Sequence, residues 1–379
     1  MRNGFASRLR CPACGRDSAL ALYAQVSDER EVREGELTCR ACGRKFPVRR
    51  GVPELLFEPP AHILAEAAGL ERFAEHMRQA GWDRETVLRL PDIEHGYWYV
   101  QARSMYQLLT TVPFRPGQSV LDVGSNTCWA SNHFAERGLE AIALDIATAE
   151  LQGLYTADWY LQDRGTFFER VLGSMDEIPL ASSSLDYVYC CEVLHHNDAA
   201  SLRRTFAEIF RVLRPGGRLL MVNETLKTVR DPNGVDTQGV EQFEGYEHAH
   251  WAWRYRWEAT RAGFFTEVAE PHYRPYFGDA SPASAADTSV RRALFASRGW
   301  GPARRAYLWW LNNIWGGVSM NVIATKPSRY VGRHEGIGSA SRLSRTALAG
   351  LRLLVARRRG TAPPRLPRTP EQAAARARG

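Results

Sequence analysis

The stretch Val120-Leu-Asp-Val-Gly-Ser-Asn-Thr-Cys-Trp129 decides the fold of this chain. Its apolar start predicts a buried strand, and the glycine followed by small polar residues predicts a tight turn into a helix. A strand, a glycine turn and a helix in this order are typical of the first unit of a doubly wound α/β sheet. Ligands bind to such a sheet at the carboxyl ends of its strands. We therefore expect Asp122 and Gly124 to lie beside a bound ligand.

The sequence after this stretch continues the same pattern. Residues 119–327 alternate short β-branched runs with helical segments, which is typical of a parallel α/β sheet. The next acid at a predicted strand end is Asp145, 23 residues after Asp122, and this spacing suits a carboxylate that binds ribose hydroxyls. The later glycines of a dinucleotide-binding turn are absent, because Asn126 and Cys128 occupy that region. A pyrophosphate on the helix N-terminus is therefore not expected.

Three further motifs follow the first one along the chain. They are GSMDEIPL at 173–180, SSLDYVYCCEVLHH at 183–196 and FAEIFRVLRPGGRLLMV at 206–222. In this order, the four motifs resemble those of class I S-adenosylmethionine-dependent methyltransferases, with a domain of the ubiquinone/menaquinone-biosynthesis type. The resemblance implies a Rossmann-like fold with a doubly wound, mostly parallel sheet of seven strands, and S-adenosylmethionine as cofactor. The cofactor-binding residues that it implies are Asp122, Gly124, Ser125, Asn126, Asp145, Ser174, Met175, Asp176 and Cys191.

Three positions depart from the pattern of that family. Asn126 stands at the second glycine of the family's DxGxGxG motif, and asparagine is one of the few residues that adopts a positive φ readily. Cys128 stands at the third glycine and narrows the turn. Ser174 stands where the family usually has an acid that contacts the adenine amine, so we expect this contact to pass to the backbone or to Asp176.

Histidines follow the fourth predicted strand of the sheet. Methyl transfer from a sulfonium is an in-line displacement, so the protein mainly aligns the acceptor. A hydroxyl acceptor must also lose a proton, and a histidine suits that task. His195 and His196 are therefore candidate catalytic residues, although a purely structural packing role is the alternative for either of them.

A second group of polar and aromatic residues follows the fifth predicted strand, between residues 241 and 257. Its aromatic side chains are candidates for the floor of an acceptor pocket, and His248 is a third candidate base. The alternative is a surface helix with one apolar face. A divalent metal bound by Glu241, Glu244 and His248 is a further hypothesis.

Two CxxC pairs stand near the N-terminus, at Cys11/Cys14 and Cys39/Cys42. Four thiolates bind Zn²⁺ tetrahedrally and leave no open position for catalysis, so a structural zinc site is expected. A redox dithiol pair is the alternative. Together with FPV at 46–48 and GVPEL at 51–55, the pairs resemble the zinc-ribbon family that accompanies tRNA and rRNA methyltransferases, as a separate activator or a fused module.

The chain divides into four predicted parts. Residues 1–58 form the zinc ribbon, and 59–118 form a helical linker or cap. Residues 119–327 form the methyltransferase domain, with a lid insertion or dimer surface at 271–316. The last part, 328–379, is a basic and largely disordered tail, and its segment from residue 329 holds twelve Arg against two acids. The rest of the chain is close to neutral, which does not favour a polyanionic substrate.

Composition limits the class of protein. Hydrophobic residues make up 44% of the 379 residues, which suits a globular chain with a sizeable core. No run approaches the roughly 18 apolar residues of a membrane span, and no secretory signal is evident, so a cytoplasmic location is expected. We expect an enzyme that methylates a small-molecule or sugar intermediate at a hydroxyl. The alternatives are an RNA base methyltransferase that docks through ribbon and tail, and a non-catalytic, cofactor-binding partner subunit. The oligomeric state, a homodimer included, stays open.

Overall fold

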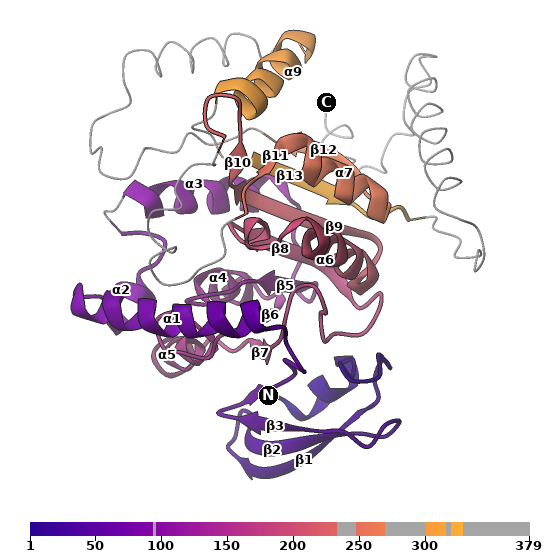
Figure 1. Cartoon of the computed structure of the whole chain (residues 1–379). Helices are drawn as coiled ribbons and strands as arrows, with labels where there is room; N and C mark the ends of the chain where they lie inside the picture. The colour runs from indigo at the N-terminus through magenta and orange to yellow at the C-terminus, as the bar shows by residue number, and fades with distance from the viewer. Residues whose placement is uncertain (94–95, 233–247, 270–300, 316–319, 329–379) are drawn as a thin grey trace, which may run out of the picture. The chain divides into compact units, whose positions relative to one another are not determined.

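The computed structural model describes residues 1–93, 96–232, 248–269, 301–315 and 320–328 (Figure 1). These residues lie within one compact unit, Met1–Tyr330. The predicted tail from residue 329 onward and the first part of the predicted lid, 271–300, fall outside the described residues. In the described part of the chain, no helix is both long and apolar enough to cross a membrane.

The N-terminal segment folds as a small antiparallel ribbon. A short 3-10 helix, η1 (Asn3–Arg8), precedes four strands in the order β1-β2-β3-β4: β1 (Leu20–Ser27), β2 (Val32–Cys39), β3 (Lys45–Arg49) and β4 (Val52–Pro53). The long spacing between the two CxxC pairs is used by the β1–β2 hairpin. Gly15 and Gly43 directly follow the two CxxC pairs and have φ values of 68° and 73°. These positive φ values allow the backbone to turn back tightly after each pair.

Helices connect the ribbon to the main sheet. They are α1 (Ala61–Gln79), α2 (Arg84–Leu88) and α3 (Gly96–Thr111). The Asp83 side chain begins α2 by accepting a hydrogen bond from the Thr86 amide at 2.8 Å. These helices lie within the segment 59–118, for which the sequence predicts a helical linker or cap.

The main sheet has seven strands in the order β12-β13-β9-β8-β5-β6-β7. In chain order these are β5 (Ser119–Val123), β6 (Glu140–Asp145), β7 (Glu169–Leu172), β8 (Leu185–Cys191), β9 (Leu213–Glu224), β12 (Phe265–Ala269) and β13 (Met320–Thr325). All neighbours pair in parallel except β13, which is antiparallel to both β9 and β12. The predicted doubly wound, mostly parallel Rossmann-like sheet is therefore confirmed.

Successive side chains of the central strands point to opposite faces of the sheet, so a hydrophobic core forms on each face. Leu121 and Val123 of β5 join the core beneath α6 (Ala199–Val212) and α7 (Ala252–Ala262). Val120 joins the opposite core, under α1, α3, α4 (Trp129–Glu136) and α5 (Ala157–Arg164). Burial on both faces explains why these parallel strands have nearly continuous apolar sequences.

The ribbon contacts the edge of the main sheet directly. Glu54, just after β4, forms a parallel bridge with Leu172 at the end of β7, and the Leu55 amide donates to the Leu172 carbonyl at 2.8 Å. Apolar ribbon residues such as Leu9 and Leu37 belong to the same core as α6. This backbone pairing covers part of an edge strand that would otherwise have unpaired amides and carbonyls.

Candidate cofactor and catalytic site

The glycine turn between β5 and α4 has three residues in the left-handed region. Gly124, Asn126 and Cys128 have φ values of 64°, 47° and 58°. The positive φ expected for Asn126 is therefore present, and Cys128 adopts the same unusual conformation directly before α4. A Cβ atom on Gly124 would lie 2.3 Å from Val193 Cγ2, so only glycine fits at this position.

Two buried carboxyl groups flank the turn. Asp122 accepts a hydrogen bond from the Ser131 hydroxyl at 2.7 Å, and burial raises its pKa to about 7. Asp145, at the end of β6, accepts from the amides of Asn126 at 2.8 Å and Ala147 at 3.0 Å. Burial also raises the pKa of Asp145, to about 6. Each oxygen of Asp145 keeps accepting capacity, as a ribose-binding role needs.

The structure places the other predicted cofactor residues at the neighbouring strand ends. Ser174 donates from its hydroxyl to Asp176 Oδ1 at 2.6 Å, so the two side chains expected to share the adenine contact are joined. The sulfur of Met175, beside them, accepts from Asn197 Nδ2 at 3.2 Å. Ser125 is buried within the turn. The cofactor-binding roles of these residues are predictions.

One buried group in the turn fits a cofactor. Thr127 is 1% exposed, and its hydroxyl has no hydrogen-bond partner among the described residues. Buried hydroxyls are normally paired, so an unpaired one beside a turn of positive-φ residues suits a polar ligand group. The Thr127 hydroxyl and the Asp145 carboxylate are compatible with a ligand that has an adenosyl and an amino-acid group, such as S-adenosylmethionine.

His195 forms a buried pair with Glu224. The short helix η3 (Leu194–His196) follows β8, and Glu224 ends the adjacent strand β9, so the two side chains meet at the carboxyl edge of the sheet. His195 Nδ1 lies 2.6 Å from Glu224 Oε1. The same carboxylate accepts from the amides of Leu194 and His195, both at 3.1 Å. Donation from Nδ1–H to Glu224 selects the tautomer in which Nε2 carries a lone pair.

His196 pairs with a different element. Its Nδ1 lies 2.9 Å from Glu66 Oε1, which comes from α1. The rings of His195 and His196 are packed against each other, with centroids 4.5 Å apart. Two histidine–carboxylate contacts therefore stand side by side after the fourth strand of the methyltransferase pattern. Only the His195–Glu224 contact is a hydrogen bond, because His196 Nδ1 has no hydrogen-bond partner among the described residues.

The third predicted histidine is close to the first two. The His248 amide donates to the His195 carbonyl at 2.6 Å, so the structure brings all three predicted catalytic residues together. Glu241 and Glu244, the other proposed metal ligands, lie outside the described residues. Of the aromatic residues expected around an acceptor pocket, Trp253 and Trp257 are instead exposed, at 57% and 44%.

Sequence reasoning missed a polar network beside Cys191. Gln101 of α3 accepts from Cys191 Sγ at 2.9 Å and donates to Glu192 at 2.8 Å. Asn223, next to Glu224, donates to Gln101 at 3.0 Å and accepts from Ser104 at 2.6 Å. The sequence offers one usable indication: Asn223 and Glu224 are polar residues at the end of a buried strand, where ligands bind in this fold.

The four ribbon cysteines form a compact cluster. Their sulfur atoms all lie within 4.8 Å of one another, with Cys11 and Cys42 3.8 Å apart and Cys14 and Cys39 3.7 Å apart. A tetrahedral zinc with Zn–S bonds of about 2.3 Å places its sulfurs about 3.8 Å apart. The geometry therefore fits a structural Zn²⁺. Among the residues that the structure describes, this is the one group of three or more potential ligands.

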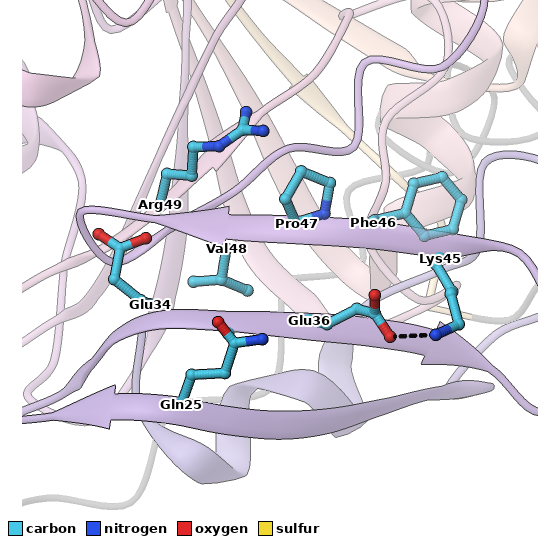
Figure 2. A pocket seen from close by; sticks show the side chains of 9 residues that line it. Gln25, Glu34, Glu36, Lys45, Phe46, Pro47, Val48 and Arg49 are labelled. Atoms are coloured by element: carbon cyan, nitrogen blue, oxygen red, sulfur yellow. Dashed lines mark ion pairs between the residues drawn. The ribbon is translucent and has the colours of Figure 1, made fainter.

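A shallow hollow on the ribbon has no part in either site. It has a volume of about 340 Å³ and is lined across β1, β2 and β3 (Figure 2). Its walls carry both charge signs, and Lys45 pairs with Glu36 at 2.9 Å. None of the predicted cofactor, catalytic or zinc residues lines it. We interpret it as a solvated surface of the ribbon.

Comparisons with known proteins find two families along the chain. Residues 121–221 match the methyltransferase domain family, and residues 7–51 match the Trm112p-like protein family. A malonyl-[acyl-carrier protein] O-methyltransferase of Enterobacter lignolyticus is 30% identical over 42% of this chain and 54% of its own length. The biotin biosynthesis bifunctional protein BioHC of Cellvibrio japonicus is 35% identical over 30% of this chain and 21% of its own length. The chain thus spans between about a fifth and about half of these relatives.

Among solved structures, similarity is found to a complex of the Haloferax volcanii Trm112 methyltransferase activator with a putative methyltransferase. That match has a TM-score of 0.44 at 18% identity and covers 68% of this chain and 97% of that one.

Proposed function

We propose that this chain, which joins an N-terminal Trm112p-like domain to a methyltransferase domain, transfers a methyl group from S-adenosylmethionine to a hydroxyl of a small-molecule or sugar biosynthetic intermediate. The observation that carries the proposal is the His195–Glu224 pair at the carboxyl edge of the sheet, 2.6 Å apart. A base that is held by a buried carboxylate is needed for a hydroxyl acceptor, whereas an acceptor that is already ionised needs none.

In this proposal the turn residues and Asp145 hold the cofactor. The bound cofactor supplies an activated methyl group, and the protein's task is to align the acceptor with it. His195 accepts the proton of the acceptor hydroxyl at Nε2, and Glu224 stabilises the imidazolium that forms, because its carboxylate faces the opposite ring nitrogen. Glu224 has a relative side-chain exposure of 0%, so water does not compete for this contact.

The ribbon enters the proposal as a zinc-bound structural module. The four thiolates would hold Zn²⁺ and thereby supply the folding energy of a unit that has little core of its own. Its match to the Trm112p-like family also makes a protein-contacting role reasonable, and here its contacts are with the methyltransferase sheet of the same chain.

A second acceptor class is favoured by one comparison. The Enterobacter lignolyticus relative is named for O-methylation of malonyl-[acyl-carrier protein], so a carboxyl oxygen is the alternative acceptor for this chain. The two classes differ in their need for a base. Ester formation at a carboxylate would survive the loss of His195 far better than ether formation at a hydroxyl.

Label transfer from methyl-labelled S-adenosylmethionine into host extract tests the proposal. The label should enter a nuclease-resistant small-molecule or glycan fraction. His195→Gln and Glu224→Gln should each lower the transfer rate by about 10²–10⁴-fold, with cofactor affinity by calorimetry unchanged. His76→Gln, an exposed substitution of the same type on α1, is the control and should transfer normally.

Three results would contradict parts of this proposal. Label that disappears with RNase would make RNA the acceptor. Normal transfer by His195→Gln, with a product that base hydrolyses to methanol, would indicate a carboxyl acceptor. Cofactor binding without any methyl transfer in the wild type would favour a non-catalytic, cofactor-binding partner subunit.

A further inference from the structure

Helix α7 exposes two tryptophans on one face. Trp253 and Trp257 are 57% and 44% exposed, and they lie one helical turn apart. The opposite face of the helix is buried and includes Ala252, Tyr255 and Ala259. Single exposed hydrophobic residues are ordinary on protein surfaces, but two large aromatic rings on the outer face of one short helix form a patch.

A third exposed aromatic residue follows the helix closely in the sequence. Phe265 begins the edge strand β12 only three residues after α7 ends and is 36% exposed. Helix α7 packs against α6 and β12 at this end of the sheet (Figure 1). We define the α7 patch as Trp253, Arg256, Trp257, Arg261 and Phe265.

The charge of the α7 patch is positive. Arg256 and Arg261 are exposed between and beyond the tryptophans. The one acid in α7 is Glu258, which is 1% exposed and contacts Arg254 at 3.0 Å and Arg203 at 3.6 Å. Its negative charge is therefore directed inward, and it does not offset the two exposed guanidinium groups.

We propose that the α7 patch docks the chain on the surface of a bilayer rich in anionic phospholipid. Tryptophan rings are amphipathic and concentrate at the membrane–water interface, and arginine pairs with lipid phosphates. Because the apolar face of α7 is packed in the protein, the contact would be made by the exposed tryptophan and arginine side chains of its outer face. The proposal concerns where the protein is held and does not depend on the identity of the methyl acceptor.

Two further observations favour a bilayer over other occupants. The outer face of a helix is convex, which suits a flat lipid surface, whereas single-stranded nucleic acid follows charged grooves. The sequence from residue 329 onward carries a net charge of +10, from twelve Arg and two Glu. Weak interfacial insertion becomes stable docking when a polybasic segment adds a second attraction to anionic lipids.

Vesicle co-sedimentation with the full chain tests the proposal. The wild type should bind vesicles that contain phosphatidylglycerol, should bind pure phosphatidylcholine at least tenfold more weakly, and should be released by salt. The double variant Trp253→Ser/Trp257→Ser should bind at least tenfold more weakly. Arg256→Glu/Arg261→Glu should lose at least fivefold. Tyr23→Ser, which removes a 69%-exposed aromatic ring from the ribbon, is the matched control and should bind normally.

Each alternative occupant gives a different result. Wild-type binding that the tryptophan variant retains would overturn the proposal. Tight binding of single-stranded RNA that the same variants lose, without vesicle binding, would make the patch a nucleic-acid surface. A dimer in lipid-free buffer that the tryptophan variant converts to monomer would make it a contact between copies of the chain. Unchanged circular dichroism and melting temperature verify that the variants fold.

Discussion

Replacing Glu31 by glutamine is expected to lower the free energy of unfolding by about 3–5 kcal/mol, because it breaks a buried ion pair between the ribbon and the main sheet. Glu31 lies in the β1–β2 turn and is 4% exposed, while Arg170 lies on β7 and is 1% exposed. Their charged groups are in direct contact. Arg33 also contacts Glu31, at 2.7 Å. Removing the carboxylate would leave two guanidinium groups with Asp158 between them, and would take away the ion-pair partner of the buried Met1 ammonium, which is 2.7 Å from Glu31.

The size of this effect follows from burial rather than from the number of contacts. An exposed ion pair contributes about 0–1 kcal/mol, because water and salt screen it. Arg8–Glu140, also between ribbon and sheet, is such a pair at 2.9 Å, with a glutamate that is 60% exposed. Glu140→Gln is therefore the matched control. For a unit of this size, Glu31→Gln should lower the melting temperature by roughly 4–7 °C, and Glu140→Gln by no more than about 1.5 °C.

The pH dependence of the stability difference between the wild type and Glu31→Gln identifies the ion pair as its cause. Burial alone would raise the pKa of Glu31, but the Arg170 guanidinium holds this pKa below its usual value of 4.5. The arginine partners of Asp158 likewise lower the pKa of Asp158 despite its burial. A lowered folded-state pKa gives stability that is present above the unfolded value and lost as the pH falls through the folded one. The gap between wild type and Glu31→Gln should therefore be full at pH 7 and shrink below about pH 4.

Thermal melts at several pH values, followed by tryptophan fluorescence, provide the measurement. The double variant Glu31→Leu/Arg170→Met should recover part of the loss, because Asp158 keeps Arg33 and Arg50. The recovery should be incomplete, because the buried Met1 ammonium loses its ion pair with Glu31. Equal melting temperatures for Glu31→Gln and Glu140→Gln would refute the reasoning. So would a gap that persists unchanged at pH 3.

Three other predictions concern the sheet edge and the ribbon. Burial raises the pKa of Asp122 to about 7, so the folded protein keeps this proton to a higher pH than the unfolded chain does. The free energy of unfolding of the wild type, relative to that of Asp122→Asn, should therefore fall by up to roughly 4 kcal/mol as the pH rises from 4 to 7. Parallel curves of unfolding free energy against pH for the two proteins would contradict this. Glu66→Gln should slow label transfer less than tenfold, against at least a hundredfold for Glu224→Gln; equal losses would make His196 as important as His195. Zinc removal, or Cys39→Ser, should unfold the ribbon and lower the melting temperature of the whole chain; a metal analysis without zinc, with an unchanged melt, would contradict the assignment.

The fold was predictable because its determinants are local. The apolar run into Gly124 and the motifs that follow it each specify a strand end and a turn over a few residues. The alternation of strands and helices then leaves few arrangements of the sheet. The cysteine cluster was predictable for the same reason, because each CxxC pair is a single turn. The conformation of Asn126 also follows from its residue type alone.

The partners of the histidines could not be predicted as readily, because they are set by tertiary structure. Glu224 is 29 residues from His195, and the two meet only because β9 lies next to β8 in the sheet. Glu66 is still more remote, since it comes from α1, and no spacing in the sequence joins it to His196. The Glu31–Arg170 pair is of the same kind, with its members 139 positions apart in the sequence.

The origin of each partner also separates the two histidines in function. A catalytic group must be held within a narrow range of positions, and it is held best by a rigid element. Glu224 ends a central strand and has no exposed side-chain surface, and it also accepts from the amides of η3, so it fixes both the ring and the backbone of His195. Glu66 is on α1, outside the sheet, and it contacts His196 alone among the described histidines. Any displacement of α1 would release His196 and leave His195 in place, so His195 is the residue whose geometry the fold itself secures.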